Sequence, residues 1–140
     1  MWRFYLQLHV LNASTDSDLE LAFAALRQQR AGGLVIGPDP FFISRSDRLG
    51  ALALQHAVPA IFEYRMFAAA GGLMSYGGTL DEPFHQVGVY TGRILNGEKP
   101  ANLPVQQSTK LELIINMKTA KALSITVPLP LSGRADEIIE

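Results

Sequence analysis

The sequence lacks cysteine altogether and has almost no excess charge. Its 140 residues include 12 basic and 13 acidic side chains, for a formal net charge of −1. Without cysteine there is no disulfide, no thiolate nucleophile and no thiolate ligand for zinc. Without clustered Lys and Arg there is no surface that would neutralise nucleic-acid phosphates, so we expect no nucleic-acid partner.

Long apolar runs and leader features are also missing. No run is long enough to span a bilayer, and the opening MWRFYLQLHVLN has neither the apolar core nor the cleavage site of a secretory signal. We therefore expect the chain, expressed as written, to be cytoplasmic. Hydrophobic residues make up 48% of the sequence, enough for one core, so residues 1–140 are predicted to form a single domain.

Motifs for catalysis and cofactor binding are absent as well. His9, His56 and His85 have no HExxH spacing, and the sequence contains no GxSxG, GxxxxGK[ST] or GxGxxG. The adjacent Asp81 and Glu82 are typical of a helix N-terminus, where acids complement the helix dipole. We therefore predict no enzyme activity, no metal and no cofactor. An α/β enzyme of flavodoxin-like outline is the weakest alternative, because no residue can be named for its chemistry.

Hydrophobic periodicity predicts alternating strands and helices. In the first half we expect strands at 6–11, 34–36 and 58–64, a helix begun by a Ser17–Glu20 capping box and ended at Gly32-Gly33, and a helix capped by Ser44.

In the second half, the clearest helix begins at Thr79 or Asp81 and ends at Gly97 with Pro100. A strand at 111–115 and a helix capped by Asn116 follow. This order predicts an α/β fold with a mostly parallel sheet and helices on both faces. The wholly apolar strand 34–36 should be central in it.

Candidate site residues follow from the sheet, because ligands bind beyond the carboxyl ends of parallel strands. Asp39 is either a turn residue held by two prolines or a carboxylate for the amino group of a small solute. Phe41 and Phe42 begin a loop, where one is expected in the core and either is a candidate for lining a cleft. Arg65 is expected to form a surface ion pair with Glu63 or Asp39, with anion binding as the alternative.

Two tyrosines are better candidates than these. Tyr64 and Tyr76 each combine a stacking face with a hydroxyl at a strand end.

Several segments together resemble a known family. They are LVIGPDPFF (34–42), VPAIFEYRMFAAAGGLMSYG (58–77), YTGRILNGEKPANLPVQQSTKLELIINMKTAKAL (90–123) and the final RADEIIE. GGLMSYG and NMKTAKAL are the most specific. The chain is similar to substrate-binding proteins of bacterial ABC transporters, in a family that includes tryptophan- and tyrosine-type binders. Ser124 departs from the glycine usual in similar sequences, which predicts a weaker helix cap, and Ser132-Gly133 replaces a helix-favouring pair.

The resemblance implies a type I periplasmic-binding-protein fold, in which two α/β lobes close on a solute, and the chain looks like the C-terminal portion only. Segments near 71–78 and 102–109 would then cross between the lobes. It also implies a periplasmic location, a small solute such as an amino acid, and a membrane permease as partner.

On this basis Gly71-Gly72 and Gly77-Gly78 are predicted to turn the chain into and out of a strand at the cleft, with Gly72 and Tyr76 at the solute. Two tight turns around an ordinary strand are the alternative. The other functional hypothesis is a ligand-sensing domain that forms homodimers through the surface left by the missing lobe.

Overall fold

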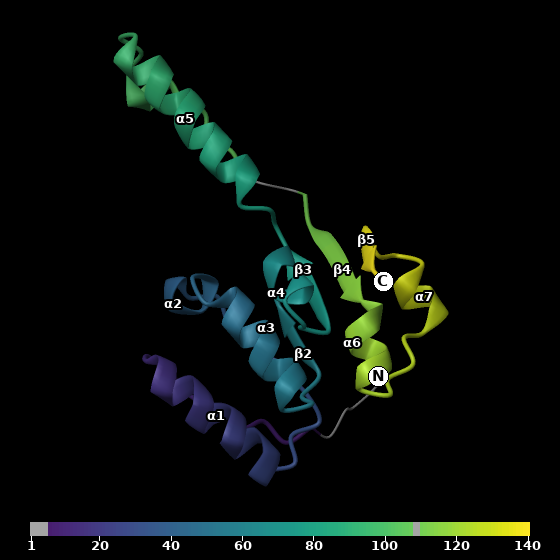
Figure 1. The fold of residues 1–140 in the computed structure, drawn as a ribbon. Helices are drawn as coiled ribbons and strands as arrows, with labels where there is room; N and C mark the ends of the chain where they lie inside the picture. Colours follow the sequence, from purple (N-terminus) through teal and green to yellow (C-terminus); the bar gives the residue numbers. More distant parts are fainter. Residues whose placement is uncertain (1–5, 108–109) are drawn as a thin grey trace.

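Strands and helices alternate through one mixed sheet (Figure 1). The computed structural model describes residues 6–107 and 110–140. Its elements in chain order are α1 (Asp16–Gln28), β1 (Leu34–Val35), α2 (Pro40–Ile43), α3 (Ser46–Gln55), β2 (Ala60–Phe62), α4 (Arg65–Ala69), β3 (Met74–Gly77), α5 (Asp81–Leu95), the 3₁₀ helix η1 (Pro100–Asn102), β4 (Glu112–Asn116), α6 (Met117–Ala122), α7 (Leu129–Ser132) and β5 (Glu137–Ile139).

The sheet has the order β1-β2-β3-β4-β5. All neighbouring pairs are parallel except β3 and β4, which run antiparallel with Ser75 opposite Ile114. The predicted α/β class with a mostly parallel sheet is therefore confirmed. The prediction that strand 34–36 is central is wrong, because β1 forms an edge of the sheet and Val35 is 80% exposed.

The strand predicted at 6–11 is also wrong. Residues 6–13 form no strand, and Leu6 and Leu8 are more than four-fifths exposed. Alternating apolar residues specify a strand only where a sheet edge pairs with them. Here only Leu11 and Ala13 reach the core, so the segment runs unpaired before α1.

Two of the predicted helix starts are displaced. The capping box of α1 is formed by Thr15 and Asp18: the Asp18 N–H donates to Thr15 Oγ1 at 3.2 Å, and the Thr15 N–H donates to Asp18 Oδ2 at 2.9 Å. Ser17 and Glu20 have the same spacing two residues further along the chain. Spacing alone therefore does not distinguish between the two possible capping boxes.

Ser44 ends the short helix α2 instead of beginning α3, because Pro40 starts a helical turn that Asp39 caps. The predicted cap at Asn116 is confirmed, since its side chain accepts the Thr119 N–H at 3.0 Å.

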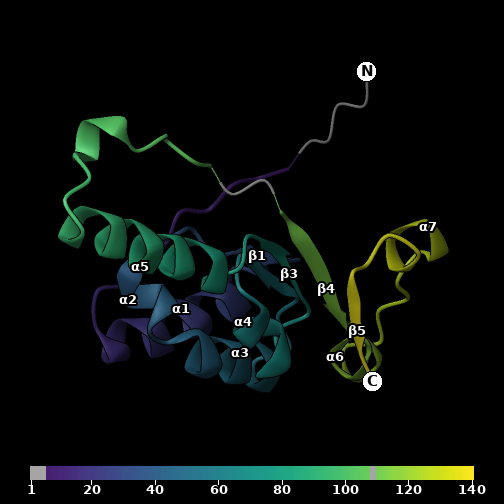
Figure 2. The same ribbon diagram turned by 90° about the horizontal axis from the view of Figure 1, so that it is seen from above.

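The core lies between the sheet and the helices α1, α3 and α4, which lie side by side (Figures 1 and 2). Phe67 of α4 is fully buried and packs edge-on against Phe62 of β2. On the other face, Val35 and Tyr76 are 80% and 55% exposed, whereas Ile115, in the same cross-strand row as Val35, is fully buried. The expectation of helices on both faces is therefore wrong for this part of the sheet.

Helix α5 projects away from the sheet on the chain that follows β3 (Figure 1). None of its residues is buried, although Phe84 and Val87 are apolar. The helix is tied to the returning chain by the Tyr90 hydroxyl, which donates to the Pro104 carbonyl, and by the ion pair of Arg93 with Glu98. Within the described ranges, no helix has the length and hydropathy that crossing a bilayer requires.

The predicted crossing segments flank this arm. Most of 71–78 forms the turn before β3 and β3 itself, so the chain leaves the sheet only at Gly78. Residues 102–107 run back from η1, while Ser108 and Thr109 lie outside the described residues. A crossing between lobes stays a prediction.

A non-glycine residue in the left-handed conformation ends helix α6. Ser124 has φ = 55°, and the Ile125 N–H donates to the Ala120 carbonyl at 2.8 Å, which completes a Schellman motif. We expect Ser124→Gly to raise the free energy of unfolding by about 1 kcal/mol, because glycine adopts this conformation without a Cβ penalty. Ser132→Gly is the control: Ser132 has helical backbone in α7, so urea denaturation should show a loss there.

Close packing of α3 on α4 gives a second prediction. A Cβ added to Gly50 would lie 2.6 Å from the Phe67 carbonyl oxygen, whereas a Cβ on Gly88 of α5 meets nothing within 4 Å. Gly50→Ala should therefore destabilise the protein by roughly 1–3 kcal/mol through overpacking. Gly88→Ala should leave stability unchanged or raise it, since alanine favours helix. Equal melting temperatures for the two variants would contradict this packing argument.

Candidate functional site

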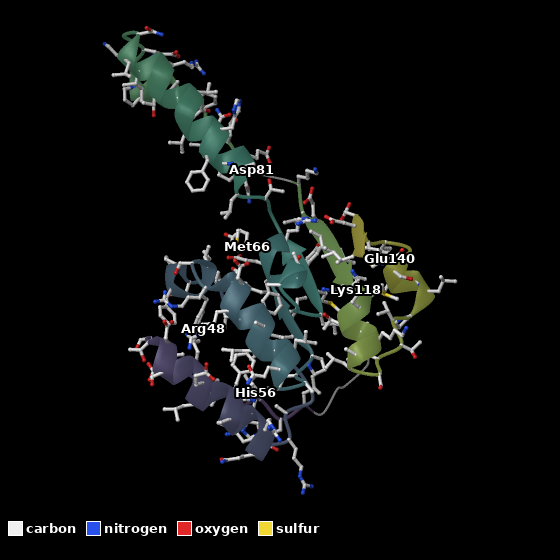
Figure 3. The ribbon with its side chains drawn as sticks, in the orientation of Figure 1. Arg48, His56, Met66, Asp81, Lys118 and Glu140 are labelled. Atoms are coloured by element: carbon white, nitrogen blue, oxygen red, sulfur yellow. The ribbon has the colours of Figure 1, made fainter. Side chains whose placement is uncertain are left out.

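A cavity of about 540 Å³ lies where β2 and β3 end and β4 begins. Its walls come from the residues after β2 (Glu63 to Met66), from the chain between β3 and α5, and from Lys110 and Glu112. Figure 3 shows Asp81 at the base of the α5 arm and Met66 on the sheet side of it. The cavity therefore joins the carboxyl edge of the parallel strands to the foot of α5.

Ser75 is the most buried polar residue of this cavity. It is 1% exposed and lies in a cross-strand row between Phe62 and Ile114, both buried and apolar. Its hydroxyl lines the cavity and has no hydrogen-bond partner among the described residues. The Ser75 oxygen opens onto the cavity, where water or a solute can reach it; the buried side-chain atom that lacks a partner among the described residues is His56 Nδ1.

Charged side chains surround the cavity, and both of its cations are paired. Arg65 donates to Glu137 of β5 through Nε at 2.7 Å and Nη2 at 2.5 Å. Lys110 Nζ lies 2.7 Å from Glu112 Oε1. The bidentate hydrogen bond holds the pKa of Glu137 below its usual value and raises that of Arg65. Arg65 therefore forms a surface ion pair, but its partner is Glu137 of β5, and the predicted partners Glu63 and Asp39 are wrong.

Tyr64 lines the same cavity as the residue before α4. Its ring packs edge-on against Phe62, and burial, followed by the neighbouring Glu63 carboxylate, raises the pKa of its hydroxyl. The phenol is therefore neutral and able to donate a hydrogen bond at any physiological pH.

Asp39 and Phe41 line a different cavity, of about 460 Å³, together with Asn12, Ser14 and Phe42. The Asp39 carboxylate accepts the Phe41 N–H at 2.8 Å and so caps α2, as in the first of its two sequence interpretations. The Arg45 guanidinium lies 4.0 Å from the centre of the Phe41 ring. Since β1 and β2 are parallel, this second cavity lies at the same edge of the sheet as Tyr64.

Gly72 and Tyr76 line neither cavity. Gly72 is buried before β3, where an added Cβ would come within 2.2 Å of the Phe67 ring, so its smallness serves packing. Tyr76 is on the opposite face of β3 from Ser75, in register with Leu113. A role for either residue in binding stays a prediction.

Of the residues that line this cavity, sequence reasoning named Tyr64 and Arg65 as candidates but not Ser75, Gly77, Asp81 or Lys110. Ser75 gives a readable signal, since it is a polar residue in a strand whose neighbours on the same face are apolar. Gly77 gives another: a Cβ there would lie 2.5 Å from the Glu63 carbonyl, so only glycine lets β3 pass this close. Asp81 begins helix α5 and Lys110 lies on the chain that returns from it. The local sequence does not specify the position of this helix, so it does not predict that the two residues line one cavity. The described residues contain no group of acids and histidines arranged to hold a metal ion.

The sequence model of one family, described as ABC transporter substrate binding protein, matches residues 2–139. Three solved structures share the fold. A conserved domain protein from Vibrio cholerae is 24% identical with a TM-score of 0.76 over 87% of this chain and 41% of its own. An ABC domain in complex with L-Trp from Streptococcus pneumoniae is 21% identical with a TM-score of 0.71 over 88% of this chain and 40% of its own.

The third is the ligand-free, open structure of a substrate-binding protein with adhesive properties from Clostridium difficile, which is 19% identical with a TM-score of 0.55 over 91% of this chain and 42% of its own. The chain thus spans about two fifths of the length of these structures. No curated protein matches it in sequence.

The Arg65–Glu137 pair, which borders the cavity, predicts a pH dependence. Because the folded state lowers the pKa of Glu137 from its ordinary 4.5, the pair stabilises the protein above that pH, and the stabilisation is lost as the pH falls through the folded-state value. Glu137→Gln should therefore lower the urea midpoint at pH 7 and have a shrinking effect below about pH 4. Glu140→Gln, which removes a carboxylate with no ion pair among the described residues, is the control.

Proposed function

The chain belongs to the ABC transporter substrate-binding protein family, and from this premise we propose that it is the solute-binding component of a bacterial ABC importer. The observation that carries the proposal is the cavity at the strand ends, with Ser75 and Tyr64 in its lining. In open parallel sheets this edge is where ligands bind. The protein would work by binding and closure, without chemistry of its own.

The α5 arm supports a two-lobed working form. Its apolar side chains, including Phe84, Val87 and Leu95, are exposed, and the chain reaches it through two linkers that start at the cavity. A helix of this kind needs a packing partner, because isolated helices of this length are marginal in water. We propose that α5 packs in a second lobe and that movement about the two linkers closes the site.

The solute that we propose is small and polar or aromatic, with an amino acid as the first choice. This choice rests on the family resemblance, together with the mixture of charges, a phenol and a hydroxyl in the cavity. The partner in transport would be a membrane permease, and the location would be the periplasm, both by family membership.

Self-association is the second candidate. The open sheet face around Val35 and Tyr76, and the exposed side of α5, are apolar surfaces that a second copy would bury. Light scattering distinguishes the two: a mass of twice 15.3 kDa that is insensitive to solutes favours self-association.

The test of solute binding is calorimetric titration of the 140-residue chain with the twenty amino acids, first as wild type and then as two tyrosine variants. We expect Tyr64→Ala to weaken binding about tenfold or more, because it removes a stacking face and a hydroxyl from the cavity. Tyr76→Ala is the matched variant on the other face of the sheet.

Lost affinity in Tyr76→Ala but not in Tyr64→Ala would move the site to the face of β3 that carries Tyr76. No binding of any amino acid by wild type would contradict the amino-acid proposal.

A further inference from the structure

We propose that the free edge of β1 is a docking site for one further β strand, which is uncharged and apolar and is supplied from outside residues 1–140. This inference does not rest on the proposed solute-binding function, because β1 lies at the end of the sheet opposite β5 (Figure 2) and lines no part of the cavity at the foot of α5. It adds a protein interface to that function.

The first observation is the backbone of β1. Its only strand neighbour among the described residues is β2. The Leu34 N–H donates to the Pro59 carbonyl at 2.8 Å, next to β2. The Ile36 N–H donates to the Ile61 carbonyl at 3.0 Å. Because alternate residues of a parallel strand turn their N–H and C=O groups to opposite sides, those of Val35 point away from β2. The edge therefore offers a donor and an acceptor to another strand.

The second observation is the sequence of this edge. Residues 31–37 read AGGLVIG, without a charge or a proline. Edge strands of native proteins commonly carry Lys, proline or a bulge that prevents another strand from adding. A wholly apolar strand is typical instead of the interior of a parallel sheet, which is where the sequence predicted residues 34–36. A strand added to β1 would reconcile its sequence with its observed position.

The third observation is a narrow apolar cavity of about 90 Å³ beside the same strand. Its lining includes Leu34 and Ile36, buried side chains of α1, and Leu11 and Ala13 of the N-terminal segment 6–13. Side chains of an added strand that lie opposite Leu34 and Ile36 would point to this face. No polar side chain of a described residue lines the cavity, so it favours an aliphatic one. Backbone pairing and a side-chain pocket are the two parts of recognition by strand addition.

The N-terminal segment favours a single strand as the occupant. Leu6, Leu8 and Val10 alternate along it and are between 74% and 85% exposed, although the segment forms no strand. It leads into the cavity lining at Leu11 and Ala13. One strand between β1 and this segment would pair with both, whereas the edge of a second copy would bring the rest of its sheet with it.

The length of the related structures favours a source outside residues 1–140. This chain covers 41%, 40% and 42% of their chains, so each has more than half of its polypeptide outside the matched length. A strand from such additional polypeptide is the occupant that we propose. Its required chemistry is an extended stretch without charge or proline and with an aliphatic side chain for the cavity.

The experiment uses the peptide acetyl-ETVVIVTK-amide, with fluorescein on its lysine, and follows fluorescence anisotropy as the 140-residue chain is added. The control peptide acetyl-ETVPIVTK-amide has the same charges. We expect the first peptide to bind about tenfold or more tightly than the control, because proline removes an N–H donor and does not fit the interior of a strand.

Two variants assign the binding to the edge. Val35→Pro removes the N–H on the free side and leaves the N–H groups of Leu34 and Ile36 in place for β2, so it should weaken the first peptide by about tenfold or more. Val35→Thr keeps the N–H and the β-branched shape, and its affinity should stay within about twofold of wild type. The control peptide covers the case in which Val35→Pro perturbs β1 itself.

A wild-type chain that binds neither peptide, or both equally, would overturn the proposal. So would a Val35→Pro variant with wild-type affinity, or an equal loss in Val35→Thr, which would move the contact to the sheet face. A mass of twice 15.3 kDa in light scattering that Val35→Pro halves would assign the edge to a second copy and would also overturn it. The proposed function is tested separately, by the amino-acid titration and Tyr64→Ala.

Discussion

The packing of Phe67 is the constraint on which the rest of the structure depends. This side chain is fully buried in α4, where its backbone leaves no room for a Cβ on Gly50 and its ring leaves none on Gly72. Two glycines from separate elements therefore allow α3, α4 and the start of β3 to meet around one aromatic ring. Because α4 is fixed in this way, Tyr64 just before it is held at the edge of the sheet.

A second, polar link fastens the C-terminal third to this centre. The buried Asn116 at the end of β4 donates to the Ala68 carbonyl at 2.8 Å and caps α6, while the Thr119 hydroxyl donates to the Gly71 carbonyl at 3.1 Å. These bonds satisfy backbone groups that burial would otherwise leave unpaired, which is costly. They place β4 antiparallel beside β3, and this pairing brings the chain returning from α5 to the cavity. The same hydrogen bonds therefore stabilise the fold and help to position the residues of the cavity.

Much of the fold was predictable, for physical reasons that differ between elements. The helix of α5 and the Asn116 cap could be read locally, because periodicity and capping act over a few residues. The family resemblance carried by GGLMSYG and NMKTAKAL is confirmed by the match over residues 2–139. The strand at 6–11 and the central position of 34–36 were wrong, because strand pairing depends on a partner that local sequence does not specify.

The sequence by itself determined the α/β class, the helix faces and the absence of nucleophile and phosphate motifs, since composition and short spacings encode these properties. Only the tertiary structure decided the site. It joined Ser75, Asp81 and Lys110, separated by as many as 35 positions in the chain, around one cavity, and it paired Arg65 with Glu137. It also placed Tyr76 on the opposite face from Ser75. Such neighbours arise from strand register and from the path of the arm, which are non-local and therefore leave no periodic signal.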